Sequence, residues 1–139
     1  FDSEMIMTAL MHDILEDSFL LDEDRIKVLF GDEVAKMVIL LSMPKMDGRV
    51  FKTKASRLKA YHQRIKTSPL KVIIIKLCDR LHNLRTMPNC TPEKIKRKTN
   101  ETMIHYVPLI HLLEPDYPEI ARKFYLKYEK AMSRLPKTT

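Results

Sequence analysis

Apolar residues recur three and four positions apart through most of this chain, which is the periodicity of an amphipathic α-helix. The most apolar segment contains the run Val72–Ile75, which would also suit a buried strand. A helical stripe continues past that run, so we expect a helix over residues 69–87. That stripe consists of Ile74, Leu77, Leu81 and Leu84. Comparable patterns predict further helices over residues 3–17, 22–30, 33–43, 55–67, 91–113 and 116–134.

Several residues at the ends of these segments indicate where the helices begin and stop. Gly31 suits the left-handed stop of one helix, and Asp32 is expected to cap the next. Thr91, Pro92 and Glu93 are typical of a cap, a first helical residue and an acidic first turn. Pro108 is expected to kink the long helix that follows, whose apolar positions are Ile95, Met103, Ile104, Val107 and Ile110.

Two of the expected helices carry acidic residues where an apolar stripe should continue. On a helix turning ~100° per residue, Asp13 and Glu16 share the face of Met5, Ile6 and Ala9. His12 and Asp17 flank that face. Carboxylates three or four residues apart repel one another, so this cluster either faces water or holds a cation.

The second acidic position is Asp79, on the most apolar helix. It shares an arc of that helix with His82, Asn83 and Thr86. Burying an unpaired carboxylate costs several kcal/mol, so Asp79 is expected to have a partner.

Together these positions suggest chemistry at a metal ion. An imidazole with two carboxylates, from His12, Asp13 and Asp79, suits Mn²⁺, Fe²⁺ or Zn²⁺. Glu16 and Asp17 could orient a water or shuttle its proton, although a frayed acidic helix end is the alternative. The neutral hydrogen-bonding groups of Asn83 and Thr86 suit a base, a ribose or a phosphate oxygen. Arg80, Arg85 and Lys76 could screen phosphates or simply be surface residues.

Composition narrows the class of protein. The 139 residues are enough for one domain, and only two glycines agree with an all-helical fold. Two cysteines provide no disulfide framework, and no apolar run reaches the length of a membrane span, so we expect a cytoplasmic protein. Residues 1–33 hold ten of the 18 acids but only two of the 25 lysines and arginines. The basic remainder suits a solvated surface, loose polyanion binding or a phosphate-rich ligand.

Three segments resemble one known family. His12-Asp13-Ile14-Leu15-Glu16-Asp17 is similar to the His-Asp-x-x-Glu-Asp motif of the RelA/SpoT-homologue hydrolases, a branch of the HD phosphohydrolase superfamily. The stretch from Ile75 to Thr86 resembles that family's second signature, Lys-Leu-x-Asp-Arg-Leu-x-Asn-x-Arg. Phe30-Gly31-Asp32-Glu33-Val34 matches a Phe-Gly-x-x-Val segment between them. The resemblance spans roughly residues 1–113.

The resemblance implies an all-α HD-domain bundle of about six to seven helices, occupying residues 1–139 as a single domain. It also implies Mn²⁺-dependent removal of the 3′-pyrophosphate from ppGpp and pppGpp, guanine nucleotides of the stringent response. By position, His12, Asp13 and Asp79 are the implied metal ligands. Glu16 and Asp17 then position the attacking water, and Asn83 and Thr86 contact the nucleotide. No membrane and no specific nucleic acid is expected as a partner.

One part of the family pattern is missing. The family's fourth metal ligand is a His on a helix before the His-Asp pair, upstream of Phe1, so the family's N-terminal helices are expected to be absent from this sequence. The short connection between Pro88 and Pro92 is similar to the small stand-alone hydrolases of the family. Three alternatives stay open. The chain could be a piece of a bifunctional synthetase/hydrolase, or a non-catalytic HD module that binds a nucleotide or a partner. It could also be a basic nucleic-acid binder.

Overall fold

The computed structural model describes residues 23–43 and 53–136. The helix expected over residues 3–17 and the loop expected over residues 44–54 lie wholly or mostly outside these ranges. The chain forms two compact units, and the boundary between them falls inside one helix, between Ile75 and Lys76.

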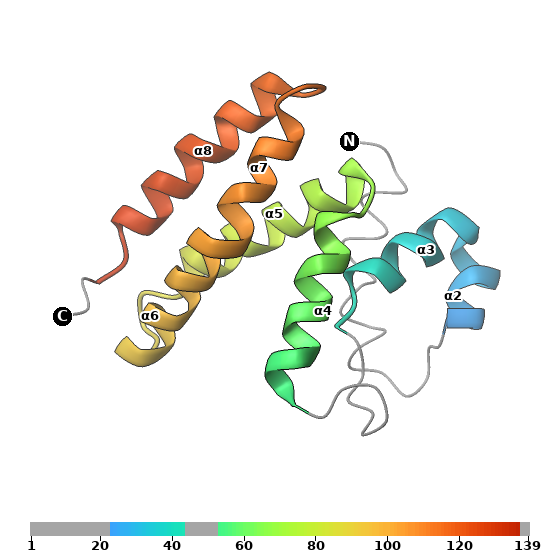
Figure 1. Ribbon diagram of the computed structural model, residues 1–139, viewed down its shortest axis with the longest axis horizontal. Helices are drawn as coiled ribbons and strands as arrows, with labels where there is room; N and C mark the ends of the chain where they lie inside the picture. Colours follow the sequence, from blue (N-terminus) through green and yellow to red (C-terminus); the bar gives the residue numbers. More distant parts are fainter. Residues whose placement is uncertain (1–22, 44–52, 137–139) are drawn as a thin grey trace. The chain divides into compact units, whose positions relative to one another are not determined.

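The described residues are helical, and they contain no strand, which confirms the all-α prediction. The first unit holds α2 (Glu23–Phe30), α3 (Asp32–Leu41), α4 (Lys54–Lys66) and the start of α5 (Leu70–Thr86) (Figure 1). The second unit holds the rest of α5 and the elements α6 (Pro92–Glu101), η1 (Thr102–Tyr106), α7 (Val107–Leu113) and α8 (Pro118–Ser133). No helix among the described residues is both long enough and apolar enough to cross a membrane.

In the first unit, a single glycine separates α2 from α3. Gly31 has φ 94°, a conformation that side chains disfavour, so its position as the stop of α2 is confirmed. Its N–H donates to the Lys27 carbonyl at 3.0 Å, and its own carbonyl accepts from the Ala35 N–H at 3.1 Å. The expectation that Asp32 caps α3 is wrong, because Gly31 occupies the cap and Asp32 is the first helical residue.

The packing of α3 and α4 follows their apolar stripes. Val34, Met37, Val38 and Leu41 are buried, as are Tyr61 and Ile65 of α4. The Tyr61 hydroxyl donates to the Leu41 carbonyl at 2.7 Å, and Arg64 donates to the Ser42 carbonyl. These bonds satisfy carbonyls at the end of α3 that no helical N–H can reach.

In the second unit, α6, η1 and α7 form one uninterrupted helix over residues 92–113, as expected. The Thr91 hydroxyl caps it by accepting from the Lys94 N–H at 3.3 Å. The irregularity expected at Pro108 is a π-helical turn just before it, in which the Val107 N–H bonds the Thr102 carbonyl. Pro108 has no N–H to offer the Ile104 carbonyl, so a regular turn could not be completed there.

The π turn also corrects the expected apolar stripe of this helix. Ile95 and Ile110 are buried, but Met103 is 52% exposed and Ile104 is 65% exposed. A turn that closes over five residues rotates the positions inside it relative to a regular α-helix. Periodicity read at 3.6 residues per turn therefore fails across this segment.

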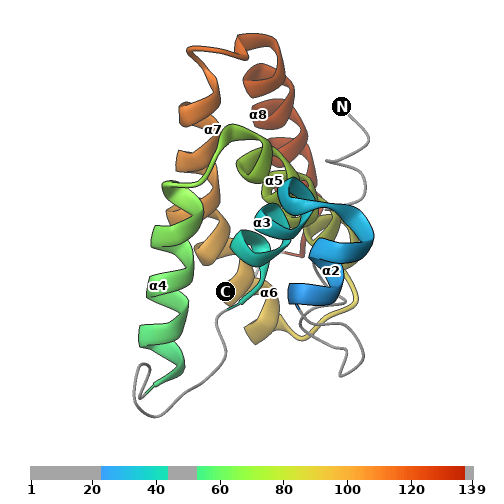
Figure 2. The same ribbon diagram turned by 90° about the vertical axis from the view of Figure 1, so that its right-hand side faces the viewer.

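The last helix, α8, lies beside α7 and runs back along it in both views (Figures 1 and 2). Its Tyr128 hydroxyl donates to the Leu77 carbonyl of α5 at 2.6 Å. Burial raises the pKa of Tyr128, which therefore stays protonated and keeps this donor. This bond fixes α8 to α5 two residues before Asp79.

Candidate metal and nucleotide site on α5

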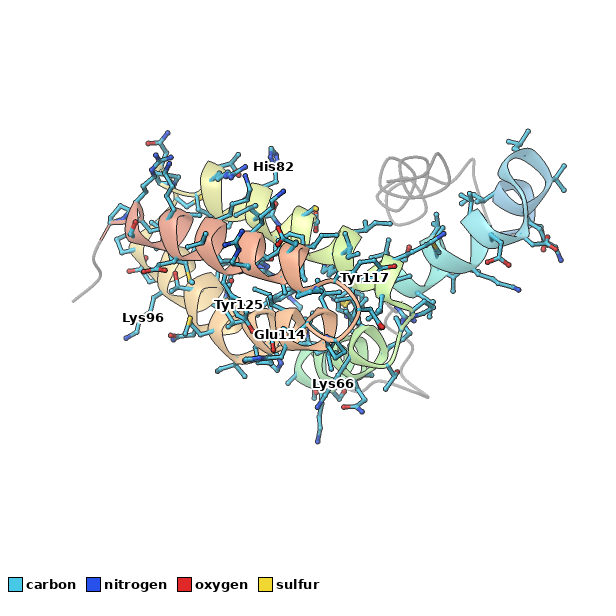
Figure 3. All side chains as sticks on the ribbon, turned by 90° about the horizontal axis from the view of Figure 1, so that it is seen from above. Lys66, His82, Lys96, Glu114, Tyr117 and Tyr125 are labelled. Atoms are coloured by element: carbon cyan, nitrogen blue, oxygen red, sulfur yellow. The ribbon has the colours of Figure 1, made fainter. Side chains whose placement is uncertain are left out.

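Helix α5 carries the predicted site residues that the structure describes. Asp79, Asn83 and Thr86 are spaced four and three apart and so share one side of the helix. The Asp79 side chain is 28% exposed, Asn83 is partly buried and Thr86 is exposed. The Thr86 hydroxyl donates to the Asn83 carbonyl at 3.2 Å. His82 is exposed and points away from the helices (Figure 3).

Asp79 has a positively charged partner, as its position on an apolar helix predicted. The Lys76 ammonium, one turn earlier, lies 3.4 Å from Asp79 Oδ2. This distance is longer than the ~2.7–2.9 Å of a strong charge-assisted hydrogen bond. A carboxylate also has about four lone-pair sites, so Asp79 keeps acceptor capacity for a cation.

The rest of the predicted ligand set is not described. His12, Asp13, Glu16 and Asp17 lie outside the described residues, and residues 23–43 and 53–136 contain no group of three or more metal-binding side chains by themselves. The donor chemistry of an imidazole and two carboxylates does suit a divalent metal. The assignment of these residues therefore stays a prediction.

Of the two alternatives for the cations beside Asp79, phosphate screening or a plain surface position, the structure excludes the second. Arg80 is only 3% exposed and the Lys76 side chain is only 13% exposed, so neither is a surface residue. Arg80 Nη2 lies 2.5 Å from Glu101 Oε1 at the end of α6. The Arg80 guanidinium carbon lies 4.2 Å from the centre of the Tyr106 ring.

The two cations beside Glu101 have pKa values shifted in opposite directions. Burial lowers the pKa of Arg80, but the neighbouring Tyr106 and Glu101 raise it, and the net pKa is raised. For Lys98, 3.8 Å from Glu101, burial lowers the pKa, Glu101 opposes this, and the nearby Arg80, Arg97 and Lys76 lower it further. Arg80 therefore keeps its charge and its bond to Glu101.

Glu101 and Tyr106 were not found from the sequence. They follow Arg80 by 21 and 26 residues in the sequence. The periodicity of one helix does not predict which residues of another helix pack against it. The feature of the sequence that could have indicated them is Arg80, because a cation on a highly apolar helix needs a carboxylate partner when it is buried.

A second tyrosine cluster lies where α7 and α8 meet. The Tyr125 hydroxyl is 2.8 Å from His111 Nδ1 and donates to Glu114 Oε1 at 3.0 Å. Figure 3 shows Tyr125 and Glu114 close together at this surface. Partial burial, together with the hydrogen bond and charge of Glu114, raises the pKa of Tyr125 to about 12.

Comparison with known proteins identifies the family. The HD domain model matches residues 1–113. The chain belongs to the HD-domain family. Over 115 residues it is 37% identical to a guanosine-3′,5′-bis(diphosphate) 3′-pyrophosphohydrolase of Haemophilus influenzae and to the bifunctional (p)ppGpp synthase/hydrolase SpoT of Escherichia coli. A guanosine-3′,5′-bis(diphosphate) 3′-pyrophosphohydrolase of Aquifex aeolicus is 40% identical over 114 residues.

These matches cover 81% of this chain but only 16% of each of these three relatives. They confirm the resemblance to RelA/SpoT-type HD hydrolases. Membership of the HD hydrolases implies a divalent metal ion. The similarity to the stand-alone type and the assignment of residues 1–139 to a single domain stay predictions.

Proposed function

We propose that this HD-domain protein hydrolyses the 3′-pyrophosphate of ppGpp and pppGpp, releasing pyrophosphate and leaving GDP or GTP. The observation that carries the proposal is the match, over 81% of the chain, to relatives named as 3′-pyrophosphohydrolases of this nucleotide. The two sequence signatures around Asp13 and Asp79 and the shared side of Asp79, Asn83 and Thr86 on α5 support it.

His12, Asp13 and Asp79 would hold the metal, for which we propose Mn²⁺. A bound divalent ion supplies Lewis-acid polarisation of a phosphoryl oxygen and makes a nearby water more acidic. Imidazole and carboxylate ligands suit Mn²⁺ because both are donors that first-row divalent metals accept.

The remaining residues act on the water and on the nucleotide. Glu16 and Asp17 orient the water toward the phosphorus that is bonded to the ribose 3′-oxygen, and one of them accepts its proton. The bond between that phosphorus and the 3′-oxygen breaks, and the proton passes to the 3′-oxygen. Asn83 and Thr86 hydrogen-bond the nucleotide, so that the reacting phosphorus stays in line with the water.

The test is to incubate the protein with ppGpp and Mn²⁺ and to measure the pyrophosphate released. We expect Asp79→Asn to lower kcat by at least ~100-fold, because a lost metal ligand removes several kcal/mol of transition-state stabilisation. Glu93→Gln, an exposed acid in the first turn of α6, is the matched control and should keep wild-type activity. A Mn²⁺-loaded wild-type protein that releases no pyrophosphate would rule the proposal out.

A further inference from the structure

The ring of Tyr106 receives two cations from α5. The Arg80 guanidinium carbon lies 4.2 Å from the ring centre and the Lys76 ammonium lies 5.9 Å from it. Lys76 and Arg80 are four residues apart, three before and one after Asp79. One aromatic ring therefore contacts the cations on both sides of the proposed metal ligand.

The π turn explains how the ring reaches this place. Residues five apart, such as Glu101 and Tyr106, lie about 140° apart around a regular α-helix. In a π turn the hydrogen bond joins residues five apart, which brings such residues toward the same side. Both Glu101 and Tyr106 thus face Arg80, and π turns of this kind are frequent at functional sites.

The ring face offsets part of the cost of placing two cations close together in a largely buried position. Like charges four apart on a helix repel one another, and both of these side chains are largely buried. Arg80 Nε and Nη1 have no hydrogen-bond partner among the described residues, so the ring face offsets part of their desolvation. Glu101 neutralises one cation, and Asp79 neutralises the other.

We propose that Tyr106 is a positioning residue for the reaction, because its ring holds Lys76 and Lys76 in turn holds the Asp79 carboxylate. The inference rests on the proposed function through the role given to Asp79. Lys76 lies 3.4 Å from Oδ2 of that carboxylate, and the contact with Tyr106 restricts where its flexible ammonium can lie. Groups that orient a metal ligand in this way typically change metal affinity or activity about 10- to 100-fold when removed.

The experiment compares two replacements of one side chain. Tyr106→Leu removes the ring but keeps an apolar side chain, and Tyr106→Phe keeps the ring. Mn²⁺ affinity is measured by calorimetry on metal-free protein, and kcat and KM are measured with ppGpp. We expect Tyr106→Leu to weaken Mn²⁺ binding and lower kcat by at least about tenfold with KM changed less than about threefold, and Tyr106→Phe to stay within about threefold of wild type.

Two further variants separate positioning from packing. Phe124→Leu removes another buried aromatic of the second unit, and it should lower thermal stability without changing Mn²⁺ affinity. Lys76→Met removes the other partner of the contact between Lys76 and Tyr106. Lys76 is less deeply buried than Tyr106, so this variant remains informative if Tyr106→Leu does not fold. It should weaken Mn²⁺ binding as Tyr106→Leu does.

Unchanged Mn²⁺ affinity in both Tyr106→Leu and Lys76→Met overturns the inference. An equal loss in Phe124→Leu, or in Tyr106→Phe, overturns it as well. Pyrophosphate release by the wild-type protein is a separate readout that decides the proposed function. A wild-type protein that binds Mn²⁺ but does not hydrolyse ppGpp therefore contradicts the proposed function. The comparison of Mn²⁺ affinities between the variants still tests the role of Tyr106 in that case.

Discussion

Two tyrosines of the second unit have similar neighbours in different surroundings. Tyr106 meets a cation that is paired with Glu101, and Tyr125 meets His111 and donates to Glu114. The side chains of Arg80 and Glu101 are 4% and 13% exposed, whereas those of His111 and Glu114 are 65% and 48% exposed. Water therefore screens the second cluster and not the first.

The same kinds of contact therefore contribute very different free energies in the two clusters. In a buried cluster, removing one partner leaves a desolvated charge, which is the costly event. In an exposed cluster, water replaces the missing partner at little cost. We therefore expect the Tyr106 cluster (Arg80, Glu101 and Tyr106) to hold α5 and Asp79 in place. The Tyr125 cluster (His111, Glu114 and Tyr125) should contribute little to stability, and its main effect should be on the pKa of Tyr125.

The largest expected effect comes from Glu101→Ala. It leaves the Arg80 charge buried without its carboxylate, so we expect the free energy of unfolding to fall by about 3–5 kcal/mol. Glu114→Ala is the matched control, with an expected loss below about 1 kcal/mol. Urea denaturation followed by circular dichroism measures both values. Equal losses in the two variants would mean that the clusters do not differ as proposed.

An intermediate effect is expected from Arg80→Lys. The charge remains, but the planar guanidinium that lies over the Tyr106 ring is lost, and lysine does not replace it at a stacked site. We expect a loss of about 2 kcal/mol, the size of a desolvated cation–π contact. A double-mutant cycle with Tyr106→Leu should give a clear coupling energy between the two positions. Additive losses would show that the stacking contributes nothing to stability.

Sequence periodicity predicted the helices of the described residues correctly because each depends on its own apolar stripe. The stripe through Leu77 and Leu84 correctly predicted α5, and it placed Asp79 and Asn83 on a common side. The pairing of Lys76 with Asp79 was also readable, since residues three apart on a helix are neighbours.

The buried cluster could not be read in this way. Arg80 meets Glu101 only because α6 packs on α5, and Tyr106 faces Arg80 through a turn that breaks the 3.6-residue period. Pro108 indicated that the helix would be irregular, but it did not indicate a π turn. The predicted ligands His12 and Asp13 lie outside the described residues, so their meeting with Asp79 stays a prediction.

The smallest effect is expected at the exposed cluster, where pH is the variable. The pKa of Tyr125 is raised from 10.0 to about 12, so the unfolded chain loses this proton first as pH rises. Between those two values the unfolded state binds fewer protons than the folded state, and stability therefore falls with rising pH. Below pH 10 the contribution of Tyr125 to the free energy of unfolding is fully present.

Following the ¹³Cζ chemical shift of Tyr125 against pH should give a midpoint near 12, and Glu114→Gln should move the midpoint toward 10. An unshifted midpoint in the wild-type protein would show that Glu114 does not hold the phenol proton.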